Sequence, residues 1–335
     1  LFLFLPKKKM KKIIYLLIFT IPFSSSLMAQ DGKPHVKIFS NFNYDVSNNN
    51  NNSDNYKEFE IKRSYLGYSY NFDDSFSTKV TFDVGKNSAG SSYTAFLKIA
   101  SLTWNANDNT TLNFGMVGTK NFKFMEKAWG KRYIYKSLQD ENKWANSADL
   151  GLTLDYKLSD NLSLDFQVLN GEGYKNLQSA DGLMRSGAGL IYKQGNYSLR
   201  ASTDYIPSEF DSLDDQVITT LAGVMKMNSV TIGGEYNIMD NTGNILDNTK
   251  IGISIYGNYK IDDNLSLFGR YDKITSEDAE ENKWDRSNDG KLTIVGVERK
   301  MTKGVTLSLN MQTSKDGQRN SEESSIFYLN IECKL

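Results

Sequence analysis

The side chains best suited to bind a ligand lie in the basic segment 120–147. Seven lysines and arginines stand here against three carboxylates, which gives the segment a net charge of +4. Clustered ammonium and guanidinium groups bind anions, phosphate groups among them. The candidates for such binding are Lys120, Lys123, Lys127, Lys131, Arg132 and Lys136.

Catalytic and metal chemistry have few residues to use. The chain of 335 residues holds one histidine, His35, and one cysteine, Cys333. A single cysteine excludes a disulfide framework and a cysteine-rich metal site, and a single histidine excludes a histidine-rich one. His35 stands at the start of the first predicted strand, far from any site that outer loops could form. We therefore expect no enzyme, no catalytic residue, no metal and no cofactor.

The elements that must position the basic segment are β-strands. A mean hydropathy of −0.49 excludes a bundle of membrane helices, which needs repeated runs of about 20 apolar residues. From Pro34 onward, apolar and polar residues alternate, as in 148–158, where leucines share one face and Asp149, Thr153 and Asp155 share the other. Alternation over about ten residues predicts strands, and about this length crosses a membrane at a tilt.

The connections between these strands are of two kinds. Seven are short turns rich in Asp, Asn and Gly, and they alternate with eight longer polar segments, of which 120–147 is the third and longest. This asymmetry is typical of outer-membrane barrels. We predict an all-β fold: a transmembrane antiparallel β-barrel of about 16 strands, with 14 or 18 as alternatives, short periplasmic turns and long outer loops.

Tyrosines next to the turns and loops support a barrel that crosses a membrane. Tyr197 and Tyr205 stand eight residues apart on one strand, and this separation of about 27 Å is close to the height of the apolar band that aromatic girdles flank. A soluble all-β protein, with its aromatic residues in a core, is the alternative. The segment 59–72 changes its apolar face between Ile61 and Leu66, which predicts either a bulge or a misread register.

Residues 1–29 have the order of a secretory signal peptide. Lysines precede the apolar run 13–23, and small residues follow it up to Ala29. The nine residues before Met10 point to an over-extended reading frame, and a short membrane anchor is the alternative reading of 13–23. Without the five lysines of this segment, 34 basic and 40 acidic residues leave a net charge of −6, which indicates no nucleic-acid partner. Residues 30–335 then form a single barrel domain in the outer membrane of a Gram-negative bacterium.

The polar face of the strands, formed by every second residue, carries charges of both signs. Sixteen strands enclose more space than side chains can fill, so these charges predict a water-filled lumen. Ion pairs within a closed wall are the alternative. The candidates for the lumen wall are Lys79, Lys98, Arg200, Arg270, Arg299, Asp83 and Asp155.

The basic segment has two possible roles in such a barrel. Folded inward, it forms a constriction whose lysines and arginines favour anions and phosphates. Left outside, it is a solvated loop whose charges meet lipopolysaccharide phosphates. The segments 206–216 and 275–290, each with a net charge of −4, oppose the entry of anions.

The first half of the mature chain contains five segments in a characteristic order: FEIKRSYLGY (59–68), FGMVGTKNF (114–122), YIYKSL (133–138), LGLTLDY (150–156) and VLNGEGY (168–174). As a set they resemble the phosphate-selective porin O and P family in its Bacteroidetes-like form. The resemblance implies a sixteen-stranded, trimeric diffusion channel. Family members often have a proline before the phenylalanine that corresponds to Phe122, where this chain has Asn121.

The sequence therefore predicts an outer-membrane porin, a water-filled diffusion channel for small hydrophilic solutes, with an anion or phosphate preference set by the basic third loop. A structural or adhesive barrel without a channel is the alternative. The expected partners are outer-membrane lipid and lipopolysaccharide, small hydrophilic solutes or anions, and further copies of the chain in a homotrimer.

Overall fold

The computed structural model describes residues 32–47, 56–87, 89–90, 92–277, 289–317 and 321–335. The predicted signal segment 1–29 lies outside these residues. Across the described ranges, no helix is both long enough and apolar enough to cross a membrane.

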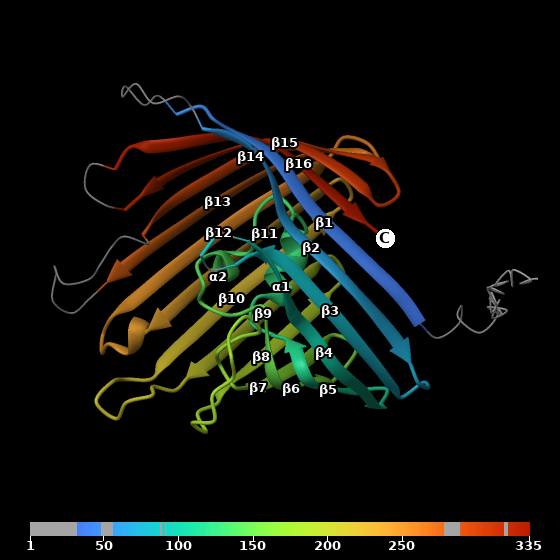
Figure 1. The fold of residues 1–335 in the computed structure, drawn as a ribbon, viewed down its shortest axis with the longest axis vertical. Coiled ribbons are helices and arrows are strands. Elements are labelled where there is room, and N and C mark those ends of the chain that lie inside the picture. The colour runs from blue at the N-terminus through green and yellow to red at the C-terminus, as the bar shows by residue number, and fades with distance from the viewer. Residues whose placement is uncertain (1–31, 48–55, 88, 91, 278–288, 318–320) are drawn as a thin grey trace, which may run out of the picture.

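The described chain folds into sixteen antiparallel strands that close into one barrel (Figure 1). Each strand pairs with its neighbours along the chain, and β1 pairs with β16 to close the sheet. The predicted number of sixteen is confirmed. The strands are β1 (Gly32–Asp45), β2 (Lys57–Asn71), β3 (Phe76–Lys86), β4 (Tyr93–Asn107), β5 (Thr110–Gly118), β6 (Ala148–Lys157), β7 (Leu162–Leu169), β8 (Arg185–Gln194), β9 (Tyr197–Ile206), β10 (Gln216–Met227), β11 (Val230–Asp240), β12 (Thr249–Lys260), β13 (Leu265–Glu277), β14 (Gly290–Thr302), β15 (Val305–Asp316) and β16 (Glu323–Lys334).

The two ends of the barrel differ as the turn signatures predicted. All seven short connections, from 72–75 between β2 and β3 to 303–304 between β14 and β15, lie at one end. The strand ends that the longer connections join lie at the other end. The start of β1 and the end of β16 both lie at the short-turn end (Figure 1).

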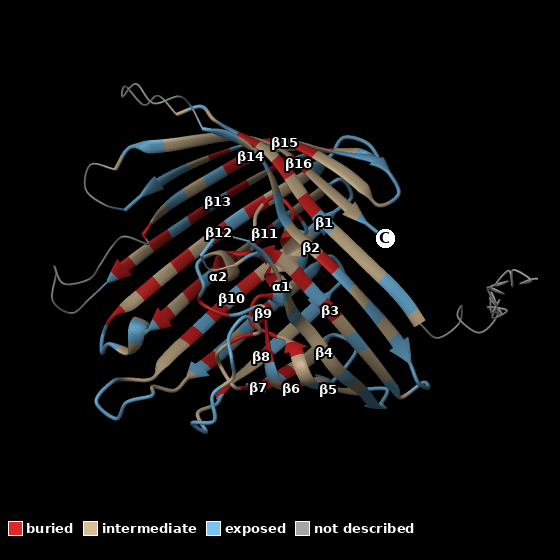
Figure 2. Ribbon diagram, in the orientation of Figure 1, coloured by how far each residue is buried: buried red, intermediate tan, exposed pale blue. Residues whose placement is uncertain are grey.

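The two faces of the sheet differ as the alternation predicted. On β13, Leu267 and Tyr271 are exposed on the outer face, whereas Arg270 and Asp272 are buried on the inner face. Tyr197 and Tyr205 are likewise exposed at opposite ends of β9. Figure 2 shows this alternation as bands along the strands. The outer wall is therefore an apolar surface, and the polar residues face the interior.

The change of face within β2 is a β-bulge. Phe39 of β1 pairs with Arg63, and the next residue, Ser40, pairs with Ile61, so Lys62 has no partner in the register. The bulge brings Arg63 to the inner face while Ile61 stays outside. A second bulge, which the sequence did not reveal, lies at Lys98, between the pairs Thr81–Ile99 and Phe82–Leu97.

The turn glycines Gly304 and Gly195 provide a test of how tightly the short-turn end is packed. Their φ angles are +82° and +52°. A Cβ on Gly304 would lie 2.2 Å from the carbonyl oxygen of Lys334, whereas one on Gly195 would meet nothing within 4 Å. We expect Gly195→Ala to cost about 1 kcal/mol, the usual penalty of a side chain at positive φ. Gly304→Ala should cost about 1–3 kcal/mol more, because the end of β16 must move. Urea unfolding of the barrel refolded in detergent measures both, and equal costs would contradict the prediction.

Candidate functional site

The third long connection, residues 119–147 (loop 3), folds into the interior of the barrel (Figure 1). It forms two short helices, α1 (Lys123–Trp129) and α2 (Leu138–Glu141). The first helix ends at Gly130, whose φ of +70° lets its N–H donate to the carbonyl oxygen of Glu126 at 2.9 Å. The inward placement of the loop was open in the sequence, and the structure settles it.

Aromatic side chains hold loop 3 against the inner wall. Trp129 lies 5.6 Å from Tyr256 on β12 and 6.0 Å from Phe268 on β13, measured between ring centroids. Tyr133 and Ile134 belong to the same buried cluster, together with Ile294 of β14. The wall therefore presents apolar residues inward where the loop packs, and the loop supplies the core that a wide barrel otherwise lacks.

Arg270 is a structural anchor of loop 3. Its Nε and Nη2 donate to the two carboxylate oxygens of Asp272 at 2.8 and 2.7 Å, and its Nη1 donates to the carbonyl oxygen of Lys136 at 2.7 Å. Its guanidinium group also lies 5.2 Å from the ring of Trp129 and 5.4 Å from that of Tyr135. This predicted lumen residue is inward but fully engaged, so it holds the loop in place.

Four of the six candidate cations of loop 3 are paired with carboxylates. Lys131 contacts Glu298 at 2.8 Å, and Lys136 contacts Glu141 at 3.1 Å. The other two pairs are Lys120 with Asp155, and Arg132 with both Glu126 and Asp140. Burial raises the pKa of Asp140, but Arg132 and then Lys136 lower it, and the net pKa lies below the usual value of aspartate. These cations are therefore largely neutralised.

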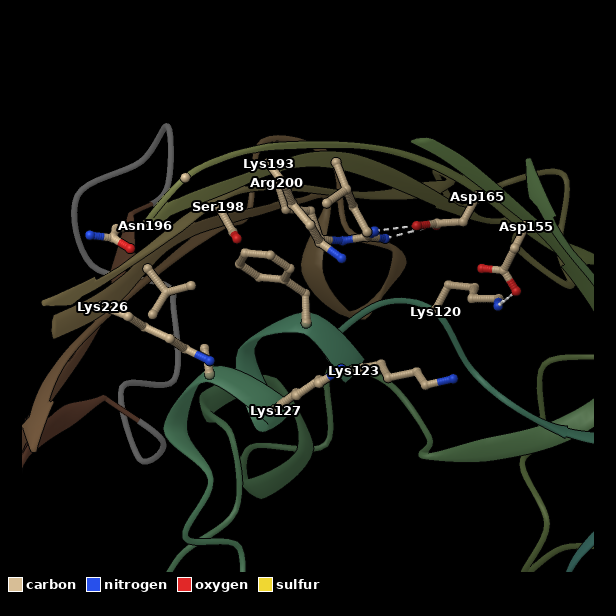
Figure 3. Close-up of a pocket in the computed structure, with 15 residues that line it drawn as sticks. Lys120, Lys123, Lys127, Asp155, Asp165, Lys193, Asn196, Ser198, Arg200 and Lys226 are labelled. Carbon is tan, nitrogen blue, oxygen red and sulfur yellow. Dashed lines mark hydrogen bonds and ion pairs between the residues drawn. The ribbon is translucent and has the colours of Figure 1, made fainter. Parts of the chain in front are cut away.

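The other two candidates, Lys123 and Lys127, are exposed inside the barrel. Neither forms an ion pair with any described residue. Both line a cavity of about 560 Å³ between α1 and the inner wall, which we call the lysine cavity. Figure 3 shows them on α1, across the cavity from the residues of strands β8 to β10. The complete lining is Lys120, Lys123, Phe124, Lys127, Ala128, Asp155, Asp165, Ile191, Lys193, Gly195, Asn196, Ser198, Arg200, Val224 and Lys226.

Two lysines of this cavity were missed in the sequence. Lys193 and Lys226 stand at the short-turn ends of β8 and β10, and within the described residues they too form no ion pair. Their inward neighbours on the same strands are Ile191 and Val224. Because these two residues are apolar, the alternation did not reveal that this face of the strands points into the barrel. Arg200, which was predicted, also lines the cavity, but its two Nη atoms bind the carboxylate of Asp165.

A second polar cluster lies nearer the long-loop end, around the fully buried Asp83. Its carboxylate accepts a hydrogen bond from Arg63 at 2.9 Å and lies 3.9 Å from the Nζ of Lys98. Lys98 also lies over the rings of Tyr65 and Tyr174, at 5.1 and 4.9 Å. Lys79, another wall candidate, is exposed on the inner face of β3.

Tyr174 reaches this cluster from residues 170–184 (loop 4). Gly171 and Gly173 adopt φ angles of +120° and +81°, and Asp149 accepts the N–H of Gly171 at 2.9 Å. This fold of the NGEGY segment aims the Tyr174 hydroxyl at Asp83, to which it donates. The sequence indicated a turn here but not its direction.

Arg299 does not line the lumen. It pairs with Leu265 and Leu307, which lie on the outer parity of their strands, whereas Glu298 faces inward toward Tyr133. The prediction for this residue is wrong because β14 has apolar residues on both faces. Ile294 faces inward and is fully buried against loop 3, so alternation alone did not identify the outer face.

Glu298 offers a test of how loop 3 is held. Its carboxylate binds the buried Lys131 and accepts the hydroxyl of Tyr133 at 2.7 Å. We expect Glu298→Ala to loosen the loop by about 3 kcal/mol, because it leaves a buried ammonium group without a counter-charge. Hydrogen exchange of the backbone amides 131–135 should accelerate. The control is Glu323→Ala, which removes the exposed partner of Lys291 and should change little. Unchanged exchange in Glu298→Ala would rule out this anchor.

Comparison with solved structures identifies the fold. The outer-membrane channel DcaP of Acinetobacter baumannii is 15% identical and covers 91% of this chain and 97% of its own, with a TM-score of 0.69. The anion-selective porin of Comamonas acidovorans is 10% identical, with coverages of 91% and 99% and a TM-score of 0.68. OprB of Pseudomonas putida is 9% identical, with coverages of 93% and 96% and a TM-score of 0.70. No family model and no curated protein sequence matches the chain. The described residues therefore have the sixteen-stranded barrel fold of these outer-membrane porins.

Proposed function

We propose that this chain is a porin in the outer membrane of a Gram-negative bacterium and that it passes small hydrophilic solutes with a preference for anions. The outer wall supports the membrane location, because exposed leucines, isoleucines and phenylalanines cover it and tyrosines stand near the strand ends. The polar inner wall supports an aqueous passage.

The anion preference depends on one observation. Lys123, Lys127, Lys193 and Lys226 surround the lysine cavity beside α1, and no described carboxylate pairs with them. The two carboxylates in the lining, Asp155 and Asp165, are already bound to Lys120 and Arg200. Four positive charges in a confined passage lower the energy of an anion there and raise that of a cation.

Charges at the long-loop end act against this preference, but they lie at the opposite end of the strands from Lys193 and Lys226 of the lysine cavity. The segment 206–216 is acidic. Its Asp215 accepts hydrogen bonds from the hydroxyl of Tyr205 on β9 and from the N–H of Ser208 in the same loop, and these neutral donors leave its negative charge in place. Salt screens exposed charges beyond about 8 Å. Part of the acidic segment 275–290 lies outside the described residues.

A preference for phosphate over chloride among the small inorganic anions, and a homotrimer, are finer proposals. The five segments that resemble the phosphate-selective porin O and P family support the first, and so does the likeness in fold to a porin described as anion-selective. A trimer form is described for OmpT of Vibrio cholerae, which is 13% identical and has a TM-score of 0.61 over 91% of this chain. Crosslinking of the purified protein in detergent would count its copies.

Replacing the two free lysines of α1 tests the selectivity. In a planar bilayer under a KCl gradient, the protein should pass chloride more readily than potassium. Lys123→Glu/Lys127→Glu should abolish most of this preference and bring the reversal potential close to zero, because the four free positive charges beside the passage become two positive and two negative ones. Lys131 is left intact, since its burial and its bond to Glu298 make it structural.

The matched control carries the same change of charge away from the lumen. Lys273 is exposed on the outer face of β13, and Lys303 lies in the turn 303–304. The double change Lys273→Glu/Lys303→Glu should leave the reversal potential nearly unchanged. A double variant of α1 that keeps the original selectivity would refute the role of these lysines. A purified protein that gives no current would favour the structural or adhesive barrel.

A further inference from the structure

We propose that the lysine cavity binds organic anions that carry an apolar group, such as an aromatic sulfonate or carboxylate, in preference to small inorganic anions. The inference rests on the anion preference proposed above and names the class of anion. It follows from the composition of the cavity, whose free charges stand beside an uncovered apolar surface.

The basic part of the cavity spans two structural elements. Lys123 and Lys127 are one turn apart on α1, and Lys193 and Lys226 come from the inner wall (Figure 3). All four are exposed to the lumen. An anionic head group between helix and wall could contact ammonium groups from both sides.

The apolar part lies on the same two elements. Phe124 and Ala128 come from α1, and Ile191 and Val224 come from the inner parity of β8 and β10. Elsewhere in the interior, inward apolar residues such as Ile294 and Phe268 are buried under loop 3. Ile191, Val224 and Phe124 are only half-buried, so they leave apolar surface facing water inside the lumen.

This apolar surface favours a ligand that can cover it. A hydrated phosphate ion would gain from the lysines but nothing from Ile191 and Val224, whereas a ring attached to an anionic group would displace water from them. The cavity of about 560 Å³ is of the size that holds a ring-bearing molecule. Lys120 is paired with Asp155, and Arg200 is paired with Asp165. The positive charge that remains available to a ligand is therefore that of the four free lysines.

The test compares two sulfonates of equal charge and head group. Benzenesulfonate and methanesulfonate are each titrated into the chloride-conducting channel in a planar bilayer, and the concentration that halves the chloride current is measured. We expect benzenesulfonate to act at about tenfold lower concentration, the effect of burying most of one ring face. Inorganic phosphate, tested in the same way, should resemble methanesulfonate more than benzenesulfonate.

Variants then assign the effect to the cavity. Ile191→Thr/Val224→Thr keeps all lysines, keeps the shape of Val224 and shortens Ile191 by one carbon. It should bring the two sulfonates to within about twofold of each other, because the apolar surface is reduced. Lys193→Gln/Lys226→Gln should weaken both sulfonates alike. Lys260→Gln, on the inner parity of β12 but outside the lining, is the control and should change neither.

The outcomes separate this inference from the proposed function. Equal half-blocking concentrations in a channel that still prefers chloride would overturn the inference and leave the anion-preferring porin in place. A preference for the aromatic sulfonate that survives Ile191→Thr/Val224→Thr would also overturn it, since the ring would then bind elsewhere. A channel without chloride preference would refute the proposed function itself.

Discussion

The interior of this barrel is too wide for its own wall to fill, and the rest of the structure depends on this constraint. Sixteen strands enclose a space in which inward side chains cannot all meet. Loop 3 supplies what is missing: Met125 and Leu138 are fully buried, and Trp129 packs between wall aromatics. A barrel with this loop has an apolar core where the loop packs on the wall, and the lysine cavity lies beside α1.

The charged residues inside the barrel fall into two groups, paired charges under loop 3 and unpaired lysines beside α1. Where loop 3 packs, cations and carboxylates are matched, as in Lys131 with Glu298 and Arg270 with Asp272, because burial of an unpaired charge is costly. Unmatched lysines occur where α1 faces open lumen, since water and passing ions can solvate them there. The total of basic residues in the loop therefore overstates the charge that acts on a solute, and the position of α1 decides which lysines act.

Periodicity and turn chemistry were enough to predict the strands and the two ends of the barrel, because these are local properties of the chain. They also indicated the change of face between Ile61 and Leu66, and the structure shows that this change is a bulge at Lys62. They did not predict properties that depend on contact across the lumen. Arg299 was assigned to the wrong face because Ile294 is apolar and inward only by virtue of packing against loop 3. Lys193 and Lys226 belong to the site because α1 lies opposite them, and Tyr174 belongs to the Asp83 cluster because loop 4 bends inward. These contacts join residues that are far apart in the sequence, so no local sequence pattern reveals them.

The pairing of β1 with β16 has a consequence for how the molecule forms. Phe39 pairs with Glu332 and Tyr44 with Phe327, so the seam joins the first and last strands of the barrel. Every other strand pair can form between neighbours, but this one must wait until the last strand is available, and bringing such distant segments together is slow. Until then both edge strands present unpaired N–H and C=O groups, which recruit other chains readily. The last step of assembly is thus the one most exposed to aggregation, and a cell that makes this barrel must protect two open edges at once.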